Sequence, residues 1–137
     1  MDCLFCKIVS GEIPSNKVYE DDFVYAFLDI YPCSEGHTIV LPKEHIPRFT
    51  DMRESDAKSL FGSVNKVAKA VEKALDVPGM NIGINNGEVA GQSVPHVHVH
   101  IIPRRENDNG GSMHTIVATH PNTDNIIELA DKIKKAF

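Results

Sequence analysis

The feature that most constrains this chain is a run of three histidines alternating with branched aliphatic residues, within Pro95-His96-Val97-His98-Val99-His100-Ile101-Ile102-Pro103. Alternation with a period of two is typical of a β-strand that is buried on one face. We therefore expect the three imidazoles on one face and the aliphatic side chains between them in the core. Pro103 lacks a backbone donor for the ladder, so the strand is expected to end there.

Three imidazoles on one strand face indicate a functional site, because clustered titratable groups usually mark one. Neighbouring side chains on one face are about 6 to 7 Å apart, so two rings can reach one phosphate or one metal ion. Neutral imidazole is also a competent nucleophile toward phosphorus. His98 lies in the middle of the run, where its neighbours can fix one ring nitrogen as a donor and leave the other lone pair for a substrate. The residues therefore favour His98 as the nucleophile.

Two other segments carry potential ligand groups. The loop of residues 85–93 contains Gly87 and Gly91 and can offer backbone N–H groups, amides and a hydroxyl to an anion. Near the N-terminus, Cys3 and Cys6 have the C-x-x-C spacing of half a metal site or of a redox pair. A redox pair is typical of a βαβ unit, which the sequence does not show, so the spacing favours metal. Two inert apolar cysteines are the alternative.

Composition places the chain among soluble globular domains, with 42% hydrophobic and 24% charged residues. The formal net charge of −5 argues against a nucleic-acid partner but allows a small phosphate ester, which needs only local donors. The sequence shows neither an apolar run long enough to span a membrane nor a signal peptide, so we expect a cytoplasmic protein without a membrane partner. Three cysteines, an odd number, argue against a disulfide framework.

Hydrophobic periodicity predicts both the elements and the fold class. Strands are expected at residues 17–20, 23–30, 37–41, 80–84 and 95–102, with a hairpin turn between the first two. Helices are expected at residues 3–11, from 51 or 55 to 76, and from a cap at Asn122 or Thr123 to the C-terminus. Short turns between strands and one long inserted helix indicate an α+β fold with an antiparallel sheet. We expect a single domain at residues 1–137, with a core at about 3–103 and a C-terminal extension at about 104–137.

The histidine run, preceded by Gly91-Gln92-Ser93, resembles the signature of the histidine triad (HIT) superfamily of nucleotide hydrolases and transferases. The resemblance covers roughly the first hundred residues and includes Phe5-Cys6-Lys7-Ile8, Glu12-Ile13-Pro14, Tyr19-Glu20-Asp21-Asp22, Phe27-Leu28-Asp29-Ile30, Gly36-His37-Thr38 and Pro42-Lys43-Glu44-His45. It implies a HIT-like fold with a five-stranded antiparallel sheet, usually in a homodimer.

The resemblance also implies an activity, which is cleavage at the α-phosphate of purine nucleoside 5′-phosphoramidates or related nucleotides through a nucleotidyl-histidine intermediate. Catalytic roles are implied for His98, His100, Ser93 and His37, the last as a histidine that orients the triad. Substrate contacts are implied for Asp29, Asn85 and Gln92 and for the apolar residues Leu4, Phe5, Ile8, Phe27 and Ile30, which by composition alone are core residues. No organic cofactor is expected.

A structural zinc ion is implied by resemblance to the bacterial HIT branch and, more distantly, to galactose-1-phosphate uridylyltransferase. Cys3, Cys6, His45 and His96 would complete a tetrahedral site. Such a site, closed by four protein ligands, has no position for an activated water.

Three alternatives stay open at this point. The protein could instead be a dinucleoside polyphosphate hydrolase or a nucleotidyl transferase that uses the same site, and the sequence does not choose between these activities. It could instead be a nucleotide-binding or scaffolding module with incidental hydrolysis. Alternatively, His96, His98 and His100 could hold a catalytic zinc ion with an open fourth position. Arg104-Arg105-Glu106-Asn107 replaces glycines of the Hint-type pattern, so the leaving group cannot be carried over from the resemblance.

Overall fold

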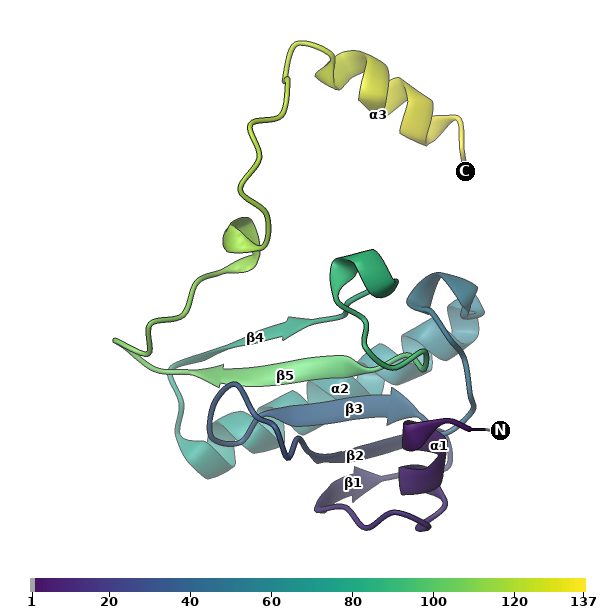
Figure 1. Cartoon of the computed structure of the whole chain (residues 1–137), viewed down its shortest axis with the longest axis vertical. Helices are drawn as coiled ribbons and strands as arrows, with labels where there is room; N and C mark the ends of the chain where they lie inside the picture. Colours follow the sequence, from purple (N-terminus) through teal and green to yellow (C-terminus); the bar gives the residue numbers. More distant parts are fainter. Residues whose placement is uncertain (1) are drawn as a thin grey trace.

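The computed structural model describes residues 2–137 and is built around a five-stranded antiparallel sheet with the strand order β1-β2-β3-β5-β4 (Figure 1). The strands are β1 (Lys17–Glu20), β2 (Val24–Leu28), β3 (Thr38–Pro42), β4 (Gly79–Gly83) and β5 (Val99–Arg104). The predicted hairpin is confirmed, because Glu20 of β1 pairs with Tyr25 of β2. The predicted α+β fold class is confirmed with it.

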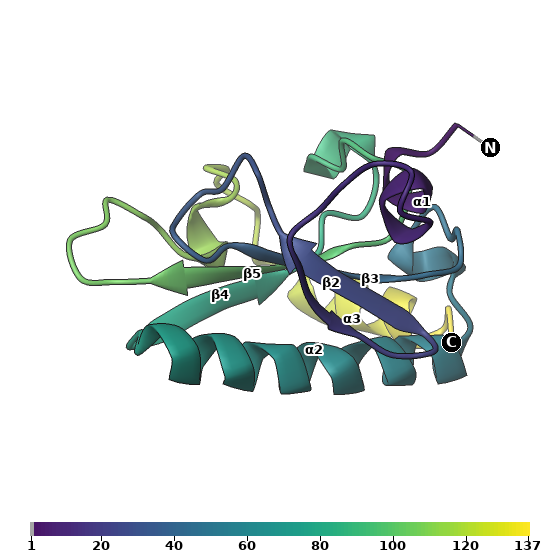
Figure 2. The same ribbon diagram turned by 90° about the horizontal axis from the view of Figure 1, so that it is seen from below.

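Helices cover the two faces of the sheet unequally. The long helix α2 (Glu54–Leu75) runs along one face, and the short helix α1 (Leu4–Val9) lies on the other (Figure 2). α2 ends at Leu75 and is capped by Asp76, whose backbone adopts the left-handed conformation at a φ of 47°. The predicted long helix is therefore confirmed almost to the residue.

Alternation along the strands produces one hydrophobic cluster on each face. The cluster beneath α2 contains Val24, Ala26, Val40, Leu60, Val64, Val67, Val97, Val99 and Ile101. The cluster on the opposite face contains Cys3, Phe5, Ile8, Tyr25, Phe27, Ile39 and Leu41. The aliphatic residues of the histidine run thus face α2, and the rings of His96 and His98 lie on the other face, edge-on to Phe5. The predicted placement of the aliphatic residues of the run in the core is confirmed.

The histidine strand begins later than the sequence predicts. β5 begins at Val99, so His96 and His98 precede the strand. The backbone of this lead-in segment has another partner, because the Val97 N–H donates to the Ile46 carbonyl oxygen at 2.8 Å. The first two histidines are therefore held by a loop and not by the sheet ladder.

β5 also continues through Pro103 to Arg104, so the prediction that Pro103 ends the strand is wrong by one residue. Pro103 pairs with Met80 of β4, whereas pairing with β3 stops at Ile101. Beyond Ile101 only one neighbouring strand flanks β5. Pro103 has no N–H to donate, but no residue of β3 pairs with it, so no β3 carbonyl oxygen loses a donor.

The C-terminal helix α3 (Ile126–Lys134) stands apart from the sheet at the end of a long irregular segment (Figure 1). It begins after the predicted caps, because Asn125 precedes it and makes no side-chain capping hydrogen bond. Within residues 2–137, no helix combines the length and the apolar composition needed to cross a bilayer. The division into a core and a C-terminal extension stays a prediction, as does the homodimer.

Truncation of Leu60 tests the contact between α2 and the sheet. Leu60 is fully buried among strand residues, so Leu60→Ala should lower the free energy of unfolding by about 2 to 5 kcal/mol in urea denaturation. Lys69→Ala, on the exposed side of the same helix, is the control and should change it by less than about 0.5 kcal/mol. Equal effects of the two substitutions would contradict this packing.

Candidate active site

The tautomer of His98 is fixed by the protein backbone. Its Nδ1 lies 2.7 Å from the carbonyl oxygen of His96. A carbonyl oxygen only accepts, so Nδ1 carries the proton and donates. The Nε2 lone pair is then left without a hydrogen-bond partner within residues 2–137. The His98 ring is nearly buried, at 5% exposure, and burial lowers its pKa. The ring is therefore a neutral imidazole with one free lone pair.

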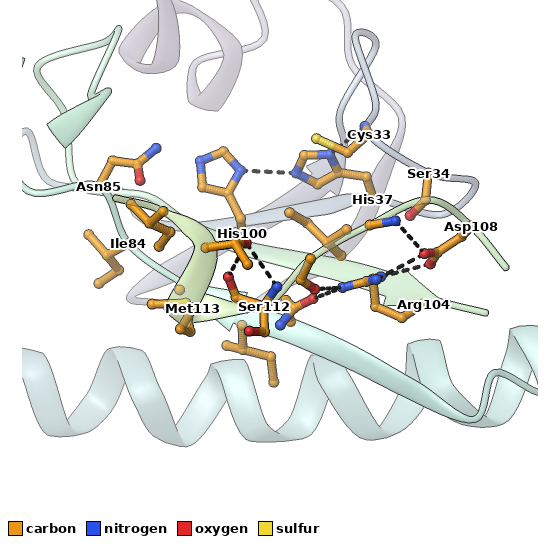
Figure 3. A pocket seen from close by; sticks show the side chains of 18 residues that line it. Cys33, Ser34, His37, Ile84, Asn85, His100, Arg104, Asp108, Ser112 and Met113 are labelled. Carbon is orange, nitrogen blue, oxygen red and sulfur yellow. Dashed lines mark hydrogen bonds and ion pairs between the residues drawn. The ribbon is translucent and has the colours of Figure 1, made fainter. Parts of the chain in front are cut away.

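A second pair of rings is oriented by a backbone N–H group. The Cys33 N–H donates to His37 Nδ1 at 3.0 Å, so the proton of the neutral His37 ring is on Nε2. That Nε2 donates to His100 Nδ1 at 2.9 Å, and the two rings face one another in Figure 3. The His100 proton is therefore on Nε2, which is buried and has no partner in the described chain. We call His37 and His100 the imidazole relay.

Burial keeps the relay uncharged. It lowers the pKa of His37, although the Asp29 carboxylate, 3.7 Å from His37 Nε2, acts in the opposite direction. Burial, with smaller contributions from His98 and His37, lowers the pKa of His100 to about 4. Near neutral pH, the unpartnered His100 Nε2–H is therefore a neutral donor for a group that enters the site.

Asp29 lies at the end of β2, beside the relay. Its Oδ1 accepts from the Tyr31 N–H at 2.9 Å, while Oδ2 faces His37. The carboxylate is half-buried, so one oxygen has accepting capacity left for a ligand hydroxyl. Its predicted contact with ribose stays a prediction.

The predicted apolar walls separate into two groups. Phe5, Ile8 and Phe27 are almost fully buried beneath α1, where the Phe5 ring centroid lies 4.9 Å from that of His98. Leu4 and Ile30 are exposed, Ile30 at 71%. Phe5 contacts the His98 ring and Phe27 packs against Phe5, whereas Leu4 and Ile30 leave apolar surface exposed.

The glycine-bearing loop is braced by Gln92. Its Oε1 accepts from the Gly87 N–H at 2.8 Å, and its Nε2 donates to the carbonyl oxygens of Pro47 and Val94 at 2.6 and 3.0 Å. The amide is thus fully engaged in holding the loop, a role that the sequence did not indicate. A direct contact of Gln92 with substrate stays a prediction, and this bracing would have to break for its amide to donate.

Ser93 and Asn85 lie at the ends of the same loop with polar groups available. Ser93 is exposed, and its hydroxyl makes no hydrogen bond within residues 2–137. Asn85 is half-buried and donates only a long 3.5 Å bond to the Gly91 carbonyl oxygen. Both side chains therefore have hydrogen-bonding capacity for an anion. Asn85 lines a cavity together with His37 and His100, whereas Ser93 lines a separate pocket with Arg48.

The fourfold Cys and His cluster predicted from the sequence is assembled by the fold. The Sγ atoms of Cys3 and Cys6 and the ring nitrogens of His45 and His96 all lie within 4.8 Å of one another. Three of the sulfur-to-nitrogen distances are 3.5, 3.5 and 3.6 Å. A tetrahedral zinc ion with Zn–S near 2.3 Å and Zn–N near 2.0 Å sets sulfur and nitrogen roughly 3.5 Å apart. The residues present therefore fit a zinc ion.

The orientation of His96 supports the same fit. Its Nε2 donates to the Pro42 carbonyl oxygen at 2.7 Å, so its Nδ1 lone pair faces the two sulfurs. A carbonyl oxygen that accepts from the other ring nitrogen fixes the tautomer of metal-binding histidines in this way. Within residues 2–137, His96, His98 and His100 do not form a group of close ligand atoms; His96 instead groups with Cys3, Cys6 and His45, and His100 groups with Asp29 and His37. This geometry disfavours a catalytic zinc ion held by His96, His98 and His100.

Asp29, His37 and His100 also form a compact group of possible ligands. A metal ion on His37 Nε2 would require the ring proton to move to Nδ1, where it would face the Cys33 N–H. Two donors would then oppose each other. This group is therefore a hydrogen-bonded relay in this conformation and not a metal site.

Fold and site together define the class of protein. A protein-family sequence model described as the HIT domain matches residues 10–107. The chain therefore belongs to the HIT family. The protein named hit of Bacillus subtilis is 50% identical over 109 residues, which make up 80% of this chain and 75% of that protein. A crystal structure of a HIT family member from Bacillus subtilis has a TM-score of 0.90 at 41% identity and covers 100% of this chain and 98% of that chain.

A relative from Saccharomyces cerevisiae is named adenosine 5′-monophosphoramidase. It is 41% identical over 108 residues, which make up 79% of this chain and 66% of that protein. The family is therefore shown by both sequence and structure, and some relatives are named adenosine 5′-monophosphoramidase.

The His100 pKa predicts how stability changes with pH. The unfolded chain titrates this ring near 6.5 and the folded chain near 4, so below about pH 6.5 only the unfolded chain gains a proton. The stability of the wild type relative to His100→Asn should be constant above about pH 6.5 and decrease as the pH falls toward about 4. Urea unfolding of both proteins across this range measures the difference. If the wild type became more stable relative to His100→Asn as the pH fell, a buried, neutral His100 would be contradicted.

Proposed function

We propose that this protein hydrolyses purine nucleoside 5′-phosphoramidates through a covalent nucleotidyl-histidine intermediate. The observation that carries the proposal is the free Nε2 lone pair of His98, left available by the bond from its Nδ1 to the backbone. A neutral ring with a lowered pKa retains that lone pair at neutral pH. The yeast relative named adenosine 5′-monophosphoramidase supports this choice of substrate.

In the proposed first step, His98 Nε2 bonds to the α-phosphorus while the P–N bond of the substrate breaks. The amine departs with the electron pair of that bond and takes one proton from solvent. The phosphorylated ring carries a positive charge, and the His96 carbonyl oxygen accepts its Nδ1–H. This carbonyl therefore stabilises the charge that develops on the nucleophile.

In the proposed second step, a water oxygen bonds to phosphorus and the N–P bond to His98 breaks. The nucleoside monophosphate leaves and the ring is again neutral. One of the two water protons replaces the proton used in the first step, and the other ends on the free amine. The two half-reactions thus consume one water molecule and regenerate the enzyme.

The surrounding residues have supporting roles in this proposal. His100 donates its unpartnered Nε2–H to a phosphate oxygen, and His37 holds His100 in the required tautomer. Ser93 and Asn85 supply further donors, while Gln92 keeps their loop in place. Asp29 accepts from the ribose hydroxyls, and the base lies against the exposed Leu4 and Ile30 surface supported by the buried Phe5, Ile8 and Phe27 side chains.

A structural zinc ion on Cys3, Cys6, His45 and His96 is part of the proposal. When bound, the ion joins α1 to the segment that precedes β5 and supplies no chemistry to the reaction. The same His96 that faces the two sulfurs provides the carbonyl oxygen for His98. Ordering the cluster therefore also orders the nucleophile. We further propose a cytoplasmic location and a homodimer, in line with the charge and family of the chain.

His98→Asn tests the nucleophile. Asparagine cannot form the covalent intermediate, so kcat/KM for adenosine 5′-phosphoramidate should fall at least about a thousandfold, with nucleotide binding retained. His120→Asn replaces an exposed histidine outside the site and is the matched control. Mass spectrometry of acid-free quenched reactions should show the nucleotidyl adduct in the wild type and in His120→Asn, but not in His98→Asn. Near-wild-type turnover by His98→Asn would reject the proposed mechanism.

Cys6→Ala tests the zinc ion. Because metal affinity for an assembled site appears as folding stability, this variant should lose zinc and melt at a lower temperature. Cys33→Ala removes an exposed thiol outside the cluster and should retain the zinc content. Metal analysis of protein purified under reducing conditions without chelator measures the zinc content of each variant, and thermal denaturation measures the melting temperature. Less than about 0.1 zinc per wild-type chain, given the affinity of structural sites, would reject the zinc ion.

A further inference from the structure

The imidazole relay depends on a loop between β2 and β3. We call residues 31–36 the relay loop. Its Cys33 N–H donates to His37 Nδ1 at 3.0 Å, and this bond assigns the ring proton of His37. The His37 N–H donates back to the Ser34 carbonyl oxygen at 3.1 Å. Both bonds join the relay loop to His37 itself, so neither fixes the loop to a neighbouring element of the fold.

One side-chain hydrogen bond does fix the relay loop to another strand. Ser34 Oγ donates to the Pro103 carbonyl oxygen of β5 at 2.7 Å. Within residues 2–137, no other hydrogen bond runs from the relay loop to a residue outside 29–38. Ser34 therefore links the loop that provides the Cys33 N–H to the strand that carries His100.

The sheet leaves this carbonyl oxygen without a partner on the β3 side. Pairing between β3 and β5 stops where Thr38 faces Ile101, whereas β5 continues to Arg104. The relay loop comes just before Thr38, so it lies beside the part of β5 that has no β3 partner. The Ser34 hydroxyl supplies the donor that β3 does not provide there.

A second contact of the relay loop is one of shape alone. Gly36 has a φ of 87°, and a Cβ atom at this position would collide with the Leu75 side chain at the end of α2. Such close packing limits how far the loop can move, but it has no preferred direction. A hydrogen bond is directional, so the Ser34 bond is the contact that sets the orientation of the neighbouring Cys33.

The orientation of Cys33 matters because the relay has two possible proton arrangements. If the His37 proton moved to Nδ1, His37 Nε2 would accept from His100 Nδ1. His100 Nε2, which is buried and without a partner in the described chain, would then carry a lone pair instead of a proton. A phosphate oxygen that entered the site would meet an acceptor, and the donor of the proposed function would be lost.

We propose that Ser34 is a positioning residue of the imidazole relay. Through its bond to Pro103 it holds the Cys33 N–H on His37 Nδ1, and so it keeps the proton of His100 on Nε2. The effect on the two tautomers does not depend on any reaction. The effect on turnover rests on the proposed nucleotidyl transfer to His98.

Ser34 can be changed without unfolding the protein. It is half-buried and lines a cavity of about 430 Å³ together with His37 and His100 (Figure 3). β4 and residues 104–116 supply other walls of this cavity. Water that enters it can replace the hydroxyl as the donor to the Pro103 carbonyl oxygen. Loss of the hydroxyl should therefore release the relay loop at a small cost in stability.

Ser34→Ala tests the proposal by the histidine tautomers and by turnover. Long-range ¹H–¹⁵N correlation NMR at about pH 7.5 should place the His37 and His100 protons on Nε2 in the wild type. In Ser34→Ala, both rings should show a second population with the proton on Nδ1. The kcat/KM for adenosine 5′-phosphoramidate should fall at least about fivefold, as for one lost neutral hydrogen bond, and mainly through kcat.

Two further variants separate positioning from a general loss of structure. Ser34→Thr retains the hydroxyl and should restore the wild-type tautomers and kcat/KM. Ser15→Ala is the matched control, because Ser15 is also half-buried and its hydroxyl lies 2.8 Å from the Tyr25 hydroxyl, outside the relay. It should lower the melting temperature by a similar amount and leave the tautomers and kcat/KM unchanged. If Ser34→Ala does not fold, Ser34→Cys, a weak donor of similar size, replaces it under reducing conditions.

The outcomes distinguish this proposal from the proposed function. Unchanged tautomers in a folded Ser34 variant would overturn the positioning role, whatever the activity. Changed tautomers with a wild-type kcat/KM would overturn its role in turnover. If the tautomers change as expected but the wild type hydrolyses no phosphoramidate, Ser34 still positions the relay and the proposed function fails.

Discussion

The hydrogen bond from His98 Nδ1 to the carbonyl oxygen of His96 is the interaction on which the rest of the site depends. A buried imidazole could carry its proton on either nitrogen, and only one choice leaves a lone pair for a substrate. The bond makes that choice with a backbone atom two residues away. The His96 ring is itself held by the Pro42 carbonyl oxygen and faces the two sulfurs, so His96 links the cysteine cluster to the nucleophile.

Much of the fold could be predicted from periodicity, because it depends on which residues share a face. Val97, Val99 and Ile101 enter the core beneath α2 as the alternation requires, and α2 has the predicted length. The start of β5 could not be predicted, because it depends on a bond from Val97 to Ile46, a residue distant in sequence. The continuation of β5 through Pro103 could not be predicted either, because it depends on how many strands pair with this end of β5 in the assembled sheet.

The composition of the candidate site was largely predictable from the sequence, but its connections were not. The spacing of Cys3 and Cys6 indicated a metal site, and the fold brings both near His96. The sequence could suggest that neighbours fix the His98 tautomer, but the fixing group is a carbonyl oxygen and not a ring. The Cys33 N–H that orients His37 has no sequence signal, because almost every residue has a backbone N–H. The bracing role of Gln92 has none either, because a glutamine in this loop is equally well interpreted as a substrate contact. The cavity beside the relay was also missed, since it exists only once residues 104–116 pack near β4.

The protonation of His37, His96, His98 and His100 can be observed directly by long-range ¹H–¹⁵N correlation NMR of ¹⁵N-labelled protein, with assignments from single histidine substitutions. At about pH 7.5, where neutral imidazole dominates, the bond geometry predicts a proton on Nδ1 of His98 and on Nε2 of His37, His96 and His100. A spectrum with this pattern would establish that the backbone prepares His98 for attack. A His98 ring protonated on Nε2 would contradict the proposed nucleophile, because that nitrogen would have no free lone pair.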